Sequence, residues 1–164
     1  MDINKKMQDA FNKQITEELY SSHLYLAMAY WFRKEGWHGF SKWMLHQAEE
    51  EKEHALDMAN FVVDRGGEVV FSMVEDVNEE FKDPQGVFET TMKHEQHVTM
   101  LINKLADVAD EENDRASINF IDRYIDEQVE EEKSVRDILH MFGHCDGHTV
   151  AKIDDILGRR QDEV

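Results

Sequence analysis

Six consecutive residues, Glu49 to His54, could supply a metal site. Five of the six side chains are carboxylates or imidazole, which bind hard cations, although acidic runs usually face water. Their spacing is more informative, because apolar residues on both sides recur at alternating steps of four and three, the spacing of one buried helical stripe. The stripe consists of Phe40, Met44, Gln47, Glu51, His54, Met58 and Phe61. Glu51 and His54 are therefore expected in the core, where a carboxylate is costly unless it is paired or binds a metal.

The composition indicates one helical domain with cations as partners. The chain has 164 residues, 41% of them hydrophobic and 33% charged, and only one proline and eight glycines to interrupt helices. Its formal net charge of −18 argues against nucleic acid or an anionic membrane surface as a partner. With Cys145 as the single cysteine, no membrane-spanning apolar run and no secretory leader, we expect a cytoplasmic protein without an intrachain disulfide.

Apolar periodicity predicts two long antiparallel helices in the first part of the chain. The first covers about residues 4–34 and carries Glu18 within its apolar stripe. A short turn at residues 36–39 then leads into the second helix, so the two should be antiparallel neighbours. The second helix contains the acidic run described above and is expected to end at Gly66-Gly67.

Residues 67–83 lack helical periodicity and are expected to form an extended crossover. The second helix, about 27 residues long, should span roughly 40 Å at ~1.5 Å per residue. An extended connection of about 17 residues can reach ~55 Å at ~3.3 Å per residue. It can therefore cross the full length of a bundle and start the third helix parallel to the second. Asp83 as N-cap and Pro84 at the first helical position mark that start.

The third and fourth helices also place polar residues in apolar register. Glu95 interrupts the stripe of the third helix, and Gln128 and Glu131 occupy core positions on the fourth. After a glycine-containing hinge at residues 143–147, residues 148–158 could form a short fifth helix. Its apolar side must be buried on its own bundle or on another subunit.

Four long helices thus each carry a metal-capable side chain near the middle of a buried stripe. The side chains expected to converge are Glu18, Glu51, His54, Glu95 and Glu131. Four clustered carboxylates would repel one another and take up protons, whereas two divalent cations would neutralise them. Oxygen ligands with a single imidazole suit iron or manganese. The alternative is a stripe shifted by one residue, which would leave the glutamates in water.

At this point the sequence resembles the ferritin family, over about residues 4–157. The matching segments are Glu17-Glu18-Leu19-Tyr20-Ser21-Ser22, Tyr25, Glu50-Glu51-Lys52-Glu53-His54, Lys93-His94-Glu95-Gln96 and Tyr124-Ile125-Asp126-Glu127-Gln128-Val129-Glu130-Glu131-Glu132-Lys133. The resemblance implies an all-α fold, a ferritin-like antiparallel four-helix bundle over residues 4–142. It has a long crossover between helices two and three and a short C-terminal fifth helix. All of residues 1–164 would form a single domain.

The resemblance also implies a ferroxidase centre with two iron sites bridged by Glu51. The ligands of the first site would be Glu18, Glu51 and His54. Those of the second would be Glu51, Glu95 and Glu131, with Gln128 alongside. Tyr25 would hydrogen-bond within the centre, where it could take part in electron transfer.

A third, inner iron site is implied by the resemblance to bacterial-type ferritins. Its ligands would be Glu50, Glu127 and Glu130. Glu127 and Glu130 lie one turn apart on the fourth helix, beside the core stripe. The alternative for these residues is a solvated acidic face.

Departures from related patterns narrow the function. Symmetric di-iron oxidases carry a second Glu-x-x-His motif, whereas the fourth helix here offers Gln128-x-x-Glu131, which favours iron storage over a permanent di-iron cofactor. The haem-binding relatives have methionine just after the bridging glutamate, and this chain has Lys52, so we expect no haem at that position. His94 and His97 are expected to be partly solvated. A weaker metal candidate comprises His140, His144, Cys145 and His148.

These features together predict a bacterial-type non-haem ferritin. By resemblance it would form a 24-subunit homo-oligomeric shell, oxidise Fe(II) with dioxygen or hydrogen peroxide, and store hydrated ferric oxide. Three alternatives remain open. They are a monomeric or dimeric di-iron oxidase with an organic substrate, a helical interaction module with surface glutamates, and a DNA-protecting mini-ferritin. The last is disfavoured because its metal site lies between subunits, whereas all the ligands here fit within one bundle.

Overall fold

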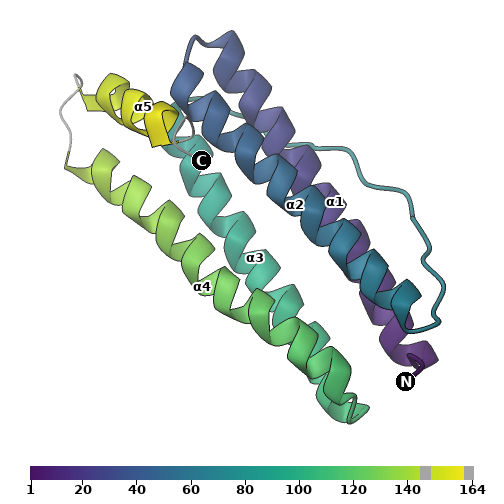
Figure 1. The fold of residues 1–164 in the computed structure, drawn as a ribbon. Coiled ribbons are helices and arrows are strands. Elements are labelled where there is room, and N and C mark those ends of the chain that lie inside the picture. The colour runs from purple at the N-terminus through teal and green to yellow at the C-terminus, as the bar shows by residue number, and fades with distance from the viewer. Residues whose placement is uncertain (145–148, 161–164) are drawn as a thin grey trace.

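The computed structural model describes residues 1–144 and 149–160, which form five helices and, within those ranges, no strand (Figure 1). The helices are α1 (Lys5–Lys34), α2 (His38–Asp64), α3 (Pro84–Glu111), α4 (Arg115–Gly143) and α5 (Thr149–Arg160). The expected all-α bundle with a crossover and a fifth helix is confirmed. In the same ranges, none of the helices combines the length and apolar character needed to span a bilayer.

Side-chain caps begin three of the long helices. Asn4 accepts a hydrogen bond from the Met7 backbone N–H at 2.9 Å, and Asp83 accepts one from the Gly86 N–H at 2.9 Å. Asp114 caps α4 in the same way through Ser117. Each cap satisfies a backbone donor that a helix start leaves unpaired. Asn4 and Asp83 therefore begin helices where the sequence predicted.

The crossover follows the outer side of α1 and returns the chain to the far end of the bundle (Figure 1). It starts at Gly66, whose φ of +71° suits glycine. The Glu68 N–H then donates to Gln8 Oε1 at 2.9 Å, and the Val70 N–H donates to Asn12 Oδ1 at 3.0 Å. Polar side chains of α1 thus hold the start of the crossover in place of a strand partner. As predicted, α3 runs parallel to α2.

The core of the bundle consists of two apolar clusters, each with buried residues from all four long helices. The cluster nearer α5 includes Tyr25, Phe32, Phe40, Phe88 and Ile138. The cluster at the other end includes Phe11, Ile15, Met58, Ile102 and Ile121. The polar residues of the four stripes lie between these clusters along the helices. Such division of the core defines a polar layer in the middle of the bundle.

α5 packs on its own bundle, through the first turn of α2. Ile153 and Leu157 are buried, and the Phe40 N–H donates to Asp154 Oδ1 at 2.7 Å. The backbones approach closely because Gly39 has no side chain. α5 ends at Arg160, two residues beyond the expected end. Two members of the weaker metal candidate, Cys145 and His148, lie outside the described residues.

Gly39→Ala is expected to destabilise the protein, because the added carbon would lie 1.7 Å from the Asp154 carbonyl oxygen. Overpacking of this kind typically costs about 1–3 kcal/mol. We expect a lower thermal unfolding midpoint and faster proteolysis within α5. Gly143→Ala is the matched control, since its added carbon has no described atom within 4 Å and alanine favours a helix. Equal midpoints for the two variants would contradict the close packing of α2 on α5.

Candidate metal centre

The polar layer contains carboxylates that are removed from solvent. Glu18, Glu51 and Glu95 are only 1%, 4% and 0% exposed, from α1, α2 and α3 respectively. His54 on α2 and Glu131 on α4 are half-buried. The helical stripes were therefore assigned in the correct register, and the alternative of solvated glutamates is wrong for the three buried ones. A charged carboxylate at such positions requires a partner of opposite charge.

Glu18, Glu51 and His54 form the tightest group. Each offers a potential ligand atom, and these atoms lie within 4.8 Å of one another. His54 Nδ1 lies 3.2 Å from Glu51 Oε2, as the spacing of one helical turn allows. Within residues 1–144 and 149–160, this is the one group of three or more such side chains that could hold a metal ion.

Glu95 lies on the other side of the layer and is held by two donors. The buried Tyr25 hydroxyl donates to Glu95 Oε1. Gln128 Nε2 donates to Glu95 Oε2 at 3.1 Å and also reaches Thr99 Oγ1 at 3.2 Å. Gln128 was expected beside the second metal site and Tyr25 was expected to hydrogen-bond within the centre, and both contact the Glu95 carboxylate directly. Their hydrogen bonds fix its orientation within the core.

Glu131 completes the set from α4. Gln47 Nε2 of α2 donates to Glu131 Oε2 at 2.9 Å, across the interface between the two helices. Burial, together with the negative charges of Glu95 and Glu50, raises the pKa of Glu131 to about 7. Glu131 therefore belongs to the same electrostatic site as Glu95, although it lies outside the tightest group.

Burial and mutual repulsion favour protonation of the carboxylates. Burial raises the pKa of Glu18 well above its usual range, and the charge of Glu51 raises it further. Burial also raises the pKa values of Glu51 and Glu95. For His54, burial opposes charge, yet hydrogen bonds to Glu127 and Glu51 raise its pKa to about 11. The group thus holds protons that a divalent cation could replace, because a cation stabilises the ionised carboxylates.

The residues expected at a third site are more dispersed. His54 Nε2 lies 3.2 Å from Glu127 Oε1, so Glu127 is in direct contact with the histidine of the first group. Glu50 is half-buried and pairs with His46, whose Nδ1 lies 3.1 Å from Glu50 Oε2. Glu130 is exposed. Glu127 thus contacts the polar layer through His54. The third site remains a prediction.

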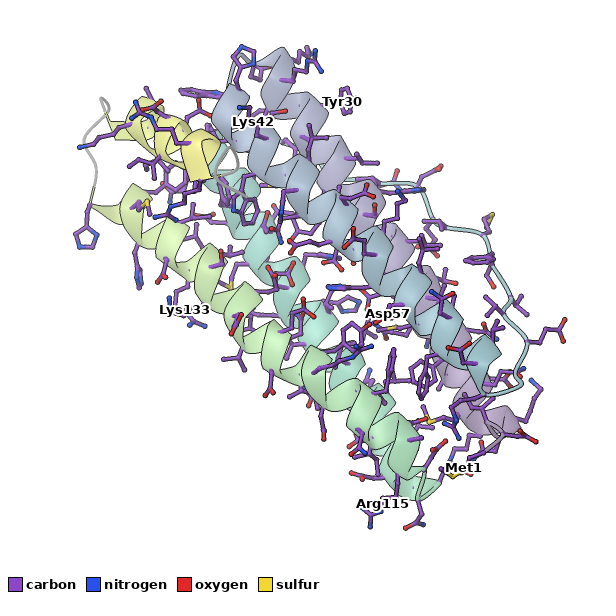
Figure 2. All side chains as sticks on the ribbon, viewed as in Figure 1. Met1, Tyr30, Lys42, Asp57, Arg115 and Lys133 are labelled. Carbon is purple, nitrogen blue, oxygen red and sulfur yellow. The ribbon has the colours of Figure 1, made fainter. Side chains whose placement is uncertain are left out.

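Two features of the layer were missed at the sequence level. Gln14 is buried and its Nε2 donates to Glu18 Oε1 at 2.8 Å. Its position four residues before Glu18 could have indicated this contact. The ring of Tyr124 meets His54 edge-on, with centroids 5.3 Å apart at 90°, and its hydroxyl donates to Asp57 Oδ2 at 2.8 Å. Figure 2 shows Asp57 between α2 and α4, and no pattern within one helix predicts that meeting.

The two histidines of α3 differ in exposure. His97 is exposed, and His94 is half-buried with its Nε2 2.9 Å from Ser21 Oγ. Burial lowers the pKa of His94 to about 4, so its imidazole is neutral near neutral pH. Both residues line a cavity of about 760 Å³ between α1, α3 and the crossover. Partial solvation was expected for both, and both fit that expectation.

Comparisons with known proteins agree with the resemblance seen in the sequence. A family model described as a ferritin-like domain matches residues 8–142. A bacterial non-heme ferritin from Bacteroides fragilis (strain 638R) is 38% identical over 158 residues, covering 96% of this chain and 99% of that protein. A bacterial non-heme ferritin from Staphylococcus saprophyticus is 35% identical over 130 residues, covering 79% of this chain and 78% of that protein.

Solved structures give the same result. The open-pore ferritin of the hyperthermophilic archaeon Archaeoglobus fulgidus superposes with a TM-score of 0.92 at 41% identity, covering 95% of this chain and 96% of that one. A closed form of the Archaeoglobus fulgidus ferritin, engineered by mutagenesis, gives a TM-score of 0.93 at 41% identity, covering 96% and 97%. The family match, the relatives and the fold lead to one conclusion. This chain belongs to the ferritin family.

Proposed function

We propose that this protein is a cytoplasmic ferroxidase that stores iron. Fe(II) would bind as a pair within one subunit and be oxidised to Fe(III) by dioxygen or hydrogen peroxide. The product would accumulate as hydrated ferric oxide inside a 24-subunit homo-oligomeric shell. The observation that carries the proposal is a layer of buried carboxylates with one imidazole in a chain of the ferritin family.

The donor set fits iron as the substrate. Glu18, Glu51 and His54 would hold one ion, and Glu51 would bridge to a second ion held by Glu95 and Glu131, with Gln128 alongside. Carboxylates favour Fe(III) over Fe(II) because the higher charge gains more from negative ligands. The oxidation is balanced when two Fe(II) ions give one electron each to dioxygen, which leaves with two protons as hydrogen peroxide. Tyr25, which donates a hydrogen bond to Glu95, would keep that carboxylate oriented during the oxidation.

The residues of α4 bear on how Fe(III), the product, would leave the proposed centre. Gln128-x-x-Glu131 stands where a symmetric di-iron cofactor site would have Glu-x-x-His, so the second ion would be held by oxygen ligands without an imidazole. The contact between His54 and Glu127 supports a path from the first ion toward Glu50, Glu127 and Glu130. These three residues would receive Fe(III) on its way to the mineral. Haem plays no part in this proposal, because Lys52 is exposed and pairs with Glu49 at 2.8 Å.

Assembly into a shell is supported by apolar residues that the single chain leaves exposed. On α1, α2 and the crossover they are Leu26, Tyr30, Leu45, Leu56, Val63, Val70, Phe71 and Met73. Figure 2 shows the Tyr30 side chain pointing away from the bundle. Exposed apolar side chains gathered on neighbouring elements mark a protein interface. We expect the purified protein to elute far above the 19.3 kDa mass of one chain, and a monomer or dimer would favour a di-iron oxidase instead.

Glu51→Ala combined with His54→Ala is expected to lower the initial rate of aerobic Fe(II) oxidation by about 100-fold, because both ions lose a ligand. The rate is measured by the absorbance of ferric product in a stopped-flow instrument. Glu53→Ala is the matched control, since it removes an exposed carboxylate of the same acidic run and should leave the rate unchanged. A double variant that oxidises iron at the wild-type rate would show that the centre is assigned wrongly.

The metal-free protein is expected to lose stability as the pH rises from about 4.5 to about 7. The folded-state pKa of Glu131 is raised to about 7, so the unfolded chain releases this proton first and unfolding becomes easier across that window. The raised pKa values of Glu18, Glu51 and Glu95 act in the same direction. After chelation, the thermal midpoint should fall with pH, and Glu131→Gln should reduce the slope. A midpoint that rises over this window would contradict the raised pKa values.

A further inference from the structure

Two buried glutamines outside the proposed ligand set hold two of the ligand carboxylates. Gln14 and Gln47 are only 4% and 6% exposed. Gln14 Nε2 donates to Glu18 Oε1 at 2.8 Å, and Gln47 Nε2 donates to Glu131 Oε2 at 2.9 Å. Both distances are those of well-formed hydrogen bonds between nitrogen and oxygen.

The two amides lie at opposite edges of the polar layer. Gln14 precedes Glu18 by four residues on α1, and Gln47 precedes Glu51 by four residues on α2. Because α1 and α2 are antiparallel, this equal spacing places the amides toward opposite ends of the bundle. Phe11 and Ile15, the neighbours of Gln14, belong to one apolar cluster, while Met44 and Ala48, the neighbours of Gln47, belong to the other. Each glutamine therefore lies where carboxylates give way to apolar packing.

The amide group suits this position because it is a donor without charge. A buried polar group is costly unless it is hydrogen-bonded, and each glutamine meets this requirement by donating to a carboxylate. A lysine or arginine would instead neutralise the carboxylate and compete with an incoming cation. The amide orients the carboxylate and leaves its negative charge available. Gln128 contacts Glu95 in the same manner at 3.1 Å.

We propose that Gln14 and Gln47 are positioning residues that keep one oxygen of Glu18 and one oxygen of Glu131 bonded within the protein. The other oxygen of each carboxylate is then free to form a single bond to a metal ion. A glutamate can bind a metal through one oxygen or through both, and binding through both holds the ion more fully. Single-oxygen binding suits a centre that passes its ion onward. The inference rests on the proposed function and adds a reason for the weak retention that storage requires.

The test replaces each amide by methionine, which has a similar length and no N–H donor. Gln14→Met and Gln47→Met are prepared as the assembled protein, with Gln96→Met on the exposed face of α3 as the control. Zn(II), a divalent ion without redox chemistry, is titrated by calorimetry. Because the released carboxylate oxygen can then also bind the ion, each variant should bind Zn(II) about tenfold more tightly, and the control should match the wild type.

Infrared difference spectra with and without Zn(II) report how the carboxylates bind. The separation of the symmetric and antisymmetric carboxylate stretches should indicate single-oxygen binding in the wild type. In Gln14→Met and Gln47→Met one carboxylate should shift toward binding through both oxygens. A merely structural role for the glutamines would not produce that shift. Weaker or unchanged binding would overturn the proposal, as would the absence of a spectral change.

The two variants lie on different helices, so either can decide the question alone if the other fails to assemble. The failure of this inference is distinguishable from failure of the proposed function. A wild-type protein that binds no Zn(II) and oxidises no Fe(II) would overturn the proposed function. A wild-type protein that does both, with methionine variants that behave identically to it, would overturn only the role of the glutamines.

Discussion

The cost of burying carboxylates determines how this molecule is built. Glu18, Glu51 and Glu95 are almost completely buried within a helical bundle, where isolated negative charges are strongly disfavoured. The carboxylates must therefore lie close enough to share protons or cations, and they must do so from different helices. This requirement sets the depth at which each glutamate occurs along its helix. The long crossover returns the chain so that α3 runs in the same direction as α2 and brings Glu95 to the depth of the other glutamates (Figure 1).

Neutral side chains around the carboxylates offset part of this burial cost by donating hydrogen bonds to them. Gln14, Gln47, Gln128 and Tyr25 each donate a hydrogen bond to a carboxylate of the layer, and none of them brings a positive charge at neutral pH. The one basic side chain in the tightest group is His54, which is itself a proposed ligand. Local structure therefore orients the carboxylates while their charge remains to be balanced by an ion. The protein therefore orients these carboxylates without neutralising their negative charge, which suits the binding of cations.

Much of this arrangement could be predicted from the sequence, because it depends on single helices. Register alone placed Glu18, Glu51 and Glu95 in the core, and Asp83 with Pro84 marked the start of α3. Contacts between helices were not predictable in the same way. The approach of His54 to Glu127 depends on how α4 is rotated against α2, and the seating of α5 depends on the backbone at Gly39. The contact of Gln14 with Glu18 lies within one helix, and the spacing of four residues between them could have indicated it.

The division of the core into two apolar clusters has a mechanical consequence. Each cluster contains residues from all four long helices, so the helices pack against one another at two separate places along the bundle. In the proposed function, iron would enter and leave the polar layer while the helices stay packed at both ends. In small zinc domains, by contrast, the ion supplies the folding energy itself, and releasing it means unfolding. A protein proposed to take up and release iron repeatedly benefits from a fold whose stability does not depend on the bound metal.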